Sequence, residues 1–333
     1  MVFPNTVPPF FPASAITAPP PTAADFEQRW AGLQAHNRWL ADFCAEAPTQ
    51  RAGVAQILLN DVDIAVAEIR WAHQAGLRGG ILLPGVPPGS DVPPLYAPDY
   101  DPIWQVCAEL GMPVNHHSGS AVPDPGMYEA SGAMFIVEIT WFSHRALWHL
   151  MFGGVFERFP DLKFVLTEQS AGWVPGTLDL LDFYLQRFRS TLDTNEMLFA
   201  GLVAAGLSRT PHEYWQANGF VGASFLSREE AAVRHEIGVD KIMWGSDFPH
   251  TEGTQPYTLE ALRSAFGGLP TDEVAAMVGG NAADLYGFDL AALAPIAAEV
   301  GPLVSDVARE LTAAEVPTDA MSPAFQPSAV RPW

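Results

Sequence analysis

Short apolar runs alternate with longer amphipathic segments along most of the chain. The run 53–59 (GVAQILL) has the length of a buried strand, whereas apolar residues in 23–44 recur every three or four positions, as on one helix face. Continuous apolar runs are typical of parallel strands that are buried on both faces. The pattern therefore predicts a parallel sheet whose strands are joined by helices.

Six strands and nine helices follow from this pattern. The predicted strands are 53–59, 77–83, 113–117, 162–168, 219–225 and 241–247. The predicted helices are 23–44, 62–75, 99–110, 139–158, 173–190, 211–217, 228–237, 258–266 and 271–285. Asp61 can cap one helix, and Ser227 with Glu230 forms a capping box before another. The proline-rich stretches 1–21 and 84–102 are predicted loops, because proline fixes φ and removes a backbone donor.

Two architectures fit this order of elements, a (β/α)₈ barrel and a doubly wound open sheet. No glycine-rich nucleotide-binding motif follows any predicted strand, which argues against the doubly wound open sheet. His117, Glu168 and Asp247 each end an otherwise apolar strand, and barrel enzymes carry their catalytic groups at that end. We therefore predict an α/β fold, a (β/α)₈ TIM barrel over 1–288, followed by a helical and irregular C-terminal extension over 289–333.

Composition narrows the functional classes. The 333 residues are 48% hydrophobic and 17% charged, and barrels often reach this length as one domain. Seventeen Lys and Arg against 38 Asp and Glu give a net charge of −21, which argues against nucleic acid or an anionic membrane as partner. No apolar run is long enough to predict a transmembrane helix. Two cysteines, Cys44 and Cys107, indicate a reducing compartment, so we predict a cytoplasmic location.

Two adjacent histidines end the predicted strand 113–117. Side chains alternate along a strand, so Asn115 and His117 share one face, and Val114 and His116 share the other. Only one of the two histidines can then enter the barrel, and His117 is nearer the strand end. The residues leave open whether this histidine binds a metal or forms a hydrogen bond within the core.

Two carboxylates end other apolar runs, Glu168 in FVLTE and Asp247 in IMWGSD. Burial of a carboxylate costs free energy unless it is paired or bound to a metal. Asp247 could instead cap the next helix, although Pro249 lies too close for a helix to begin at once. Glu168 could instead pair with an arginine or with the start of the next helix. His250 and Glu252 follow Asp247 as further candidates, with solvated loop residues as the alternative.

The strand-end residues favour metal chemistry over a nucleophilic hydrolase. No GxSxG motif occurs, and neither cysteine has the sequence context of a nucleophile. His117, Glu168 and Asp247 together indicate one mononuclear site, since zinc and similar ions take histidine nitrogen and carboxylate oxygen as ligands.

Four segments resemble a known family. They are 113–120 (PVNHHSGS), 153–175 (GGVFERFPDLKFVLTEQSAGWVP), 241–250 (KIMWGSDFPH) and 279–288 (GGNAADLYGF). In this order they resemble the amidohydrolase-related family that includes aminocarboxymuconate semialdehyde decarboxylase, over about 37–288. The resemblance implies a (β/α)₈ barrel with one divalent metal, often zinc. It also implies decarboxylation or hydrolysis of small carboxylated, often aromatic, compounds, in proteins that are often dimers.

The resemblance also implies roles for individual residues. His117 matches a metal ligand of the family's fifth strand, and Asp247 matches the ligand and proton-handling carboxylate of the eighth. Glu168 stands where many members carry a catalytic histidine, so the expected role of Glu168 is proton transfer. The family's first-strand ligand pair has no counterpart here, because the chain starts at MVFPNTVPPF. We therefore expect a barrel without its first strand and helix, weak metal binding, and no ladder hydrogen bonds from the proline-rich start.

These observations predict a metal-dependent decarboxylase or hydrolase acting on a small carboxylated molecule, with zinc as the expected metal. Two alternatives stay open: an amide or lactone hydrolase that uses the same site, and a non-catalytic barrel, because the first-strand ligands are missing. The expected partner is a small-molecule substrate, and a homodimer is left open.

Overall fold

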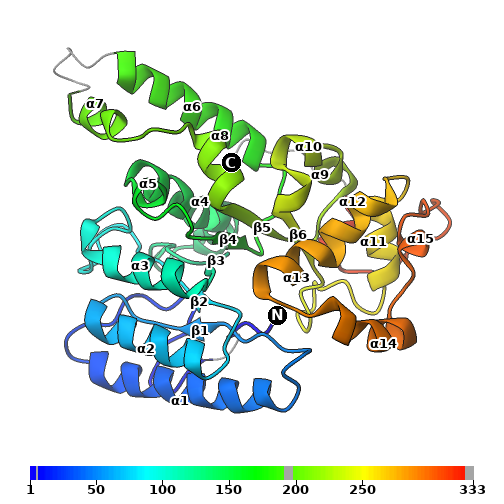
Figure 1. Ribbon diagram of the computed structural model, residues 1–333, viewed down its shortest axis with the longest axis horizontal. Helices are drawn as coiled ribbons and strands as arrows, with labels where there is room; N and C mark the ends of the chain where they lie inside the picture. The colour runs from blue at the N-terminus through cyan, green and yellow to red at the C-terminus, as the bar shows by residue number, and fades with distance from the viewer. Residues whose placement is uncertain (5–6, 191–197, 327–333) are drawn as a thin grey trace. The chain divides into compact units, whose positions relative to one another are not determined.

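The computed structural model describes residues 1–4, 7–190 and 198–326 (Figure 1). Contacts divide the chain into two compact units. Unit 1 comprises Met1–Leu166 and Leu178–Gly219, and unit 2 comprises Thr167–Thr177 and Phe220–Trp333. Among the described helices, none combines the length and the apolar composition that a membrane crossing requires.

Unit 1 is built from parallel strands that alternate with helices, as the sequence pattern predicts. Its strands lie in the order β1-β2-β3-β4. They are β1 (Ala55–Gln56), β2 (Ile81–Leu82), β3 (Val114–His117) and β4 (Phe164–Thr167). Its helices are α1 (Phe26–Ala45), α2 (Val62–Gln74), η1 (Pro98–Tyr100), α3 (Asp101–Leu110), α4 (Ser131–Phe152), α5 (Val155–Arg158), α6 (Val174–Ser190), α7 (Leu198–Ala205) and α8 (Pro211–Asn218), of which α6 begins in unit 2.

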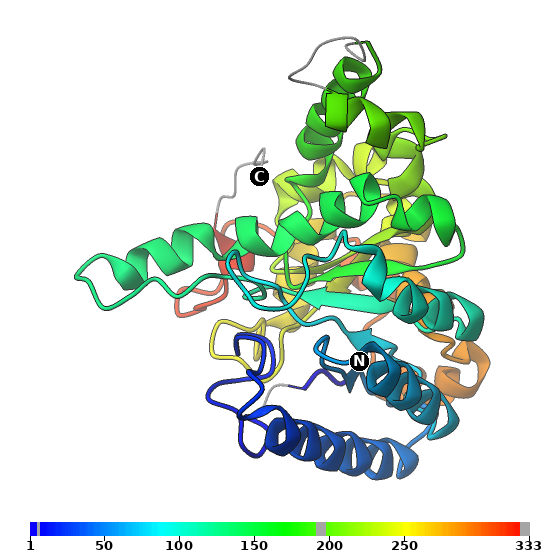
Figure 2. The same ribbon diagram turned by 90° about the vertical axis from the view of Figure 1, so that its left-hand side faces the viewer.

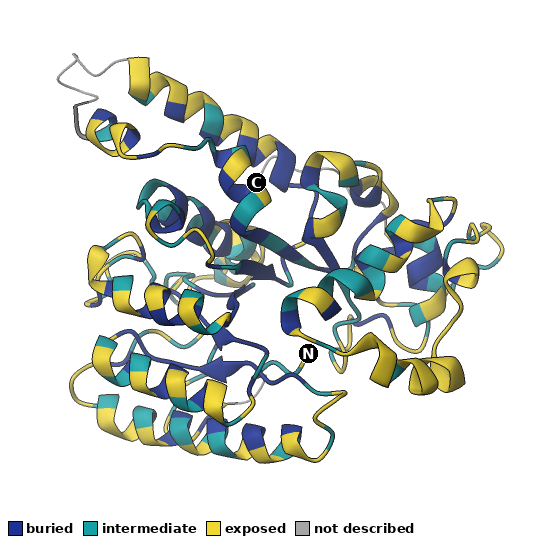
Figure 3. Ribbon diagram, viewed as in Figure 1, coloured by how far each residue is buried: buried dark blue, intermediate teal, exposed yellow. Residues whose placement is uncertain are grey.

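The strands of unit 1 are shorter than the apolar runs that contain them, and every strand residue is buried (Figure 3). Ile81 pairs with Ala55 on one side and with Val114 on the other. Gly80 precedes β2 with φ 83°, and a Cβ there would lie 1.9 Å from the Pro113 carbonyl oxygen. Only glycine permits this approach, which sets the spacing of β2 and β3.

The N-terminal edge of unit 1 differs from the expectation. Val2 forms a parallel bridge with Gly53, in which its N–H donates to Ala52 at 2.9 Å and its carbonyl accepts from Val54 at 3.0 Å. The prediction that the proline-rich start adds no ladder hydrogen bonds is therefore wrong at Val2. The physical reason is that Val2 precedes the first proline, Pro4, and keeps its backbone donor.

Unit 2 contains the remaining strands and helices. Its strands β5 (Gly219–Ser224), of which Gly219 counts with unit 1, and β6 (Ile242–Gly245) pair in parallel, with Val221 opposite Ile242. Its helical segments are α9 (Arg228–Ala232), α10 (Arg234–Ile237), η2 (Val239–Lys241), α11 (Thr258–Phe266), α12 (Thr271–Ala275), η3 (Ala276–Gly280), α13 (Asn281–Tyr286), α14 (Leu290–Val300), α15 (Val304–Val307) and η4 (Pro323–Phe325).

Most predicted helices are present, but three differ. The predicted helix 139–158 is two helices, α4 and α5, separated by Gly153 and Gly154. Helix α4 begins at Ser131 rather than 139, because its first turns are mostly apolar and give no periodic signal. The predicted helix 228–237 is two helices that meet at Val233. The predicted helix 271–285 is interrupted by the π-turn η3. Helix α7 was not predicted from the sequence.

Candidate metal centre

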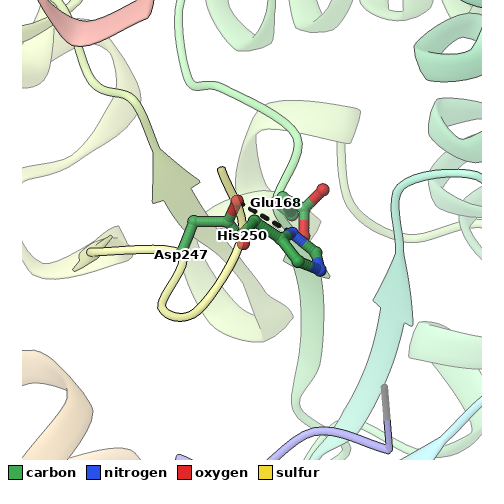
Figure 4. A group of neighbouring side chains, drawn as sticks. All are labelled: Glu168, Asp247 and His250. Carbon is green, nitrogen blue, oxygen red and sulfur yellow. Dashed lines mark hydrogen bonds and ion pairs between the residues drawn. The ribbon is translucent and has the colours of Figure 1, made fainter. Parts of the chain in front are cut away.

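Three side chains of unit 2 converge on one point (Figure 4). Glu168 directly follows β4, whereas Asp247 and His250 lie in the segment after β6. Each offers one ligand atom, and these atoms all lie within 4.8 Å of one another. Nδ1 of His250 lies 3.0 Å from Oδ2 of Asp247. Two carboxylates and one imidazole thus form a compact donor set.

The backbone at both carboxylates is held in an uncommon conformation. Glu168 has φ 57° and Asp247 has φ 55°, in the left-handed region that residues other than glycine rarely adopt. The Glu168 N–H nevertheless donates to the Gly222 carbonyl at 2.9 Å, so the segment after β4 stays joined to β5. Strained residues of this kind concentrate at functional sites, where the surrounding structure fixes a side-chain direction.

The loop after β6 is a tight turn that brings His250 back to Asp247. The His250 N–H donates to the Asp247 carbonyl at 2.9 Å, and the Thr254 N–H donates to the Ser246 carbonyl at 3.0 Å. A Cβ on Gly253 would lie 2.9 Å from the Asp247 carbonyl oxygen, so glycine is needed there. No helix begins in this turn, since α11 starts at Thr258. The alternative that Asp247 is a helix cap is therefore wrong.

Electrostatics favour a cation at this point. Burial, followed by the negative charge of Glu168, raises the pKa of Asp247 to about 6, although His250 opposes the shift. Two carboxylates that face one another repel each other when both are ionised, and a nearby cation relieves that repulsion. One imidazole with two carboxylate oxygens is a donor set that zinc and manganese accept. The residues present therefore fit a divalent metal.

A buried carboxylate on a neighbouring helix holds the segment that follows Glu168. Glu230 is only 4% exposed, and its Oε1 accepts from the N–H groups of Ala171 at 2.8 Å and Gly172 at 2.9 Å. Its Oε2 accepts from the Ser227 N–H at 3.0 Å, which completes the predicted capping box. Glu230 thus joins α9 to the segment that carries Glu168. The N–H groups just before α6 therefore bond to Glu230, and not to Glu168 as one alternative from the sequence had it.

Replacement of Glu230 by alanine should lower the free energy of unfolding by about 3 kcal/mol, because buried backbone donors at Ala171 and Gly172 lose their acceptor. Urea unfolding measures this loss. The matched control is Glu229→Ala, an exposed neighbour in the same helix, which should change stability by less than about 0.5 kcal/mol. Equal stability of the two variants would contradict the anchoring role of Glu230.

The two adjacent histidines belong to unit 1 and lie in different surroundings. The ring of His116 stacks on Phe164, which in turn packs on Phe156 of α5, so His116 faces the helices. Burial lowers the pKa of His116 to about 4. Nδ1 of His117 lies 2.8 Å from the Ser118 carbonyl, and its ring meets Phe3 edge-on. A proton on Nδ1 makes Nε2 the basic nitrogen, which is the form that binds a metal.

His117→Ala should lower metal occupancy more than His116→Ala does, because alternation along a strand sets the two histidines on opposite faces, and His117 is the one that the sequence predicts as a ligand. Metal analysis of both purified variants after dialysis against manganese or zinc would measure the difference. Greater metal loss in the His116 variant would show that the ligand has been assigned to the wrong face of β3.

The remaining candidate, Glu252, lies exposed in the turn after β6 and outside the cluster formed by the described residues. Sequence reasoning thus found all three members of the cluster. The proton-transfer role that the family resemblance implies for Glu168 stays a prediction. The anchoring role of Glu230 was not predicted from the sequence. The capping-box motif predicts the bonds of Glu230 within its own helix. It gives no sign of the bonds from Ala171 and Gly172, which lie 59 and 58 positions away in the chain.

The family model for amidohydrolases matches residues 3–288. The chain therefore belongs to the amidohydrolase family, and it has the (β/α)₈ TIM-barrel fold of that family. No curated protein sequence matches it.

Several solved structures are similar in fold. A 5-carboxyvanillate decarboxylase from Sphingomonas paucimobilis is 22% identical with a TM-score of 0.61, over 77% of this chain and 72% of that one. A 2,6-dihydroxybenzoate decarboxylase in complex with 2,6-dihydroxybenzoate is 20% identical with a TM-score of 0.64, over 83% and 81%. A dihydroxybenzoic acid decarboxylase from Polaromonas sp. JS666, with bound manganese and 2-nitroresorcinol, is 20% identical with a TM-score of 0.62, over 82% and 79%. The chain is thus an enzyme of the amidohydrolase family, and its fold resembles that of decarboxylases, one of which was solved with bound manganese.

Proposed function

We propose that this protein is a divalent-metal-dependent decarboxylase of a small aromatic carboxylic acid. The observation that carries the proposal is the convergence of Glu168, Asp247 and His250 after two parallel strands. The structures similar in fold include decarboxylases of dihydroxybenzoate and carboxyvanillate, one of them with manganese. Manganese and zinc are both candidates for the metal, and zinc is the ion that the family resemblance favours.

Glu168, Asp247 and His250 would hold the metal. His117 belongs to unit 1 and is not a member of this cluster of described residues, so its ligand role stays a prediction from the sequence. When bound, the metal supplies positive charge that orients an anionic substrate and stabilises negative charge developing on it. The contact between His250 Nδ1 and Asp247 Oδ2 fixes the direction of the Asp247 carboxylate. The loop that carries His250 and the anchoring of the Glu168 segment by Glu230 keep both carboxylates in place.

The chemistry also needs a proton donor. Decarboxylation replaces a carbon–carboxylate bond by a carbon–hydrogen bond, so one proton must reach the ring carbon as carbon dioxide leaves. Glu168 and Asp247 are the carboxyl groups at the site, and we propose that they carry this proton. Amide or lactone hydrolysis by the same residues remains the second candidate, and it differs in its products.

The test is release of carbon dioxide by the purified chain. Apo-protein loaded with manganese or zinc would be assayed against 2,6-dihydroxybenzoate, 5-carboxyvanillate and related acids, beside amide and lactone substrates. Metal-dependent carbon dioxide release, abolished by chelation and restored by metal, is the expected result. Absence of bound metal would favour the non-catalytic barrel, whereas ring opening or amide cleavage without carbon dioxide would favour the hydrolase.

Two further proposals concern organisation and location. We propose that residues 1–288 form the catalytic barrel and that 289–333 is an appended extension, which is supported by α14 having no buried residue. A cytoplasmic location stays a proposal, supported by Cys44 and Cys107 being buried and not joined in a disulfide. Enzyme assays of a variant that ends at 288 would test the first proposal.

A further inference from the structure

The chain beyond α14 folds back onto unit 2. We call residues 304–326 the clasp, which includes the helical segments α15 and η4. Both segments contact α11, beside which α15 lies in Figure 1, and Figure 2 shows the clasp from another side, in orange to red. Most residues of the clasp are exposed, but Val307, Ser322 and Ala324 are buried. The clasp is thus held on α11 at a few points, although the family model ends before it, at residue 288.

One arginine of α11 holds the middle of the clasp. Arg263 is only 4% exposed, and its Nη2 donates to the Glu310 carbonyl at 2.8 Å and to Glu315 Oε2 at 2.8 Å. The Nε of Arg263 donates to the Arg309 carbonyl at 3.2 Å. The Thr312 N–H donates to the same Glu315 oxygen at 3.0 Å. Because hydrogen bonds between charged groups are the stronger ones, the contact of Arg263 with Glu315 is the main anchor of the clasp.

A second contact joins the clasp to the loop after β6, which carries two of the candidate metal ligands. The Tyr257 hydroxyl donates to Asp319 Oδ1 at 2.7 Å, and Tyr257 is the residue that precedes α11. The first residue of α11, Thr258, has its Oγ1 3.1 Å from Thr254 Oγ1. The Thr254 N–H in turn donates to the carbonyl of Ser246, the residue just before the first ligand of the loop. A continuous series of contacts therefore leads from the clasp to the metal ligands.

The loop after β6 has few buried residues of its own. Between Phe248 and Pro256, only Gly253 and Thr254 are buried, and His250 is half-buried. Segments with few buried contacts open at a low cost in free energy, unless their ends are held. Strand β6 holds the first end of this loop, so the conformation of the loop depends on how firmly α11 holds the other end.

We propose that the clasp positions the loop after β6 in the conformation in which Asp247 and His250 meet, so that docking of the clasp strengthens metal binding. The inference rests on the metal site of the proposed function. Arg263 and Glu315 are positioning residues, since neither belongs to the ligand cluster. A docked clasp orders the loop in advance, which lowers the entropy that metal binding must remove. By thermodynamic linkage, a bound metal then favours docking of the clasp by the same factor.

The test uses the full-length protein with Glu315→Ala, which removes the charged partner of Arg263. Isothermal titration with manganese or zinc should show an affinity at least threefold weaker than that of the wild type. In the metal-free variant, hydrogen exchange in peptides that cover 248–256 should be at least tenfold faster. Glu315→Gln keeps an acceptor oxygen and should restore most of both properties. The matched control is Glu299→Ala on α14, a helix with no buried residue, which should behave like the wild type.

Two further measurements extend the test. Asp319→Ala removes only the acceptor of the Tyr257 hydroxyl and should cause the same changes to a smaller extent. This milder variant decides the question if circular dichroism shows that Glu315→Ala is unfolded. In the wild type, bound manganese or zinc should slow hydrogen exchange in peptides of the clasp, as linkage requires.

The outcomes separate this inference from the proposed function. Folded variants whose loop exchanges at the wild-type rate would overturn the positioning role of the clasp. Faster exchange together with unchanged metal affinity would overturn its coupling to the metal. A wild type that binds neither manganese nor zinc would contradict the proposed function and the coupling, whereas faster loop exchange in the metal-free variants would still support the positioning role.

Discussion

Asp247→Asn is expected to lower turnover by about 10²–10⁴-fold while leaving the fold intact. The amide keeps the shape of the side chain but removes the negative charge that holds a metal and the carboxyl group that transfers a proton. Asp247 is half-buried and interacts with both His250 and Glu168. The measurements are steady-state kinetics with saturating manganese and circular dichroism of the purified variant.

A control in the same loop separates this effect from general damage. Glu252 is exposed in the turn after β6, so Glu252→Gln should retain wild-type turnover within about twofold. Retention of more than about a tenth of wild-type turnover by Asp247→Asn would remove Asp247 from the mechanism.

Glu168→Gln is expected to weaken manganese affinity at least tenfold and to lower turnover to a similar extent as Asp247→Asn. The sequence leaves Glu168 open as a general acid or base or as a metal ligand, and the family resemblance favours proton transfer. Its ligand atom lies within 4.8 Å of those of Asp247 and His250, so we expect both roles. Isothermal titration with manganese measures the first effect, and turnover at saturating manganese measures the second.

These two readouts distinguish the roles of Glu168. A ligand role lowers affinity, and turnover then recovers as manganese is raised, whereas a proton-transfer role leaves turnover low at saturation. Unchanged affinity together with unchanged turnover would exclude both. Gln169→Glu is unsuitable as a control because Gln169 is buried. Glu229→Gln, an exposed carboxylate on α9, serves instead.

The sequence predicted the α/β class and the candidate carboxylates because both depend on local patterns. Apolar runs ended by a polar residue placed Glu168 and Asp247 correctly after parallel strands. The start of α4 could not be predicted, because helix periodicity is visible only where one face is buried and its first turns lack such a face. The isolated bridge at Val2 could not be predicted, because a single pair of hydrogen bonds produces no periodic pattern of apolar residues in the sequence.

The contacts within the cluster were harder to predict than the identity of its residues. The sequence leaves His250 open as a site residue or a solvated loop residue. Only the turn closed through Gly253 brings its ring to Asp247. Likewise, the hydrogen bonds from Ala171 and Gly172 to Glu230 join segments that are distant in the sequence. Contacts of this kind follow from the tertiary fold, so a pattern within one segment carries no sign of them.

The ligand atoms of Glu168 and Asp247 come from positions that are roughly eighty residues apart in the chain, although both belong to unit 2. Binding a metal here would close that long loop much as a covalent cross-link does. Because the unfolded chain cannot hold the three ligands together, the ion would stabilise only the folded form, by about 2.7 kcal/mol at a hundredfold excess over its Kd. Metal supply in the cell would then govern how much folded protein accumulates, as well as how fast each molecule works.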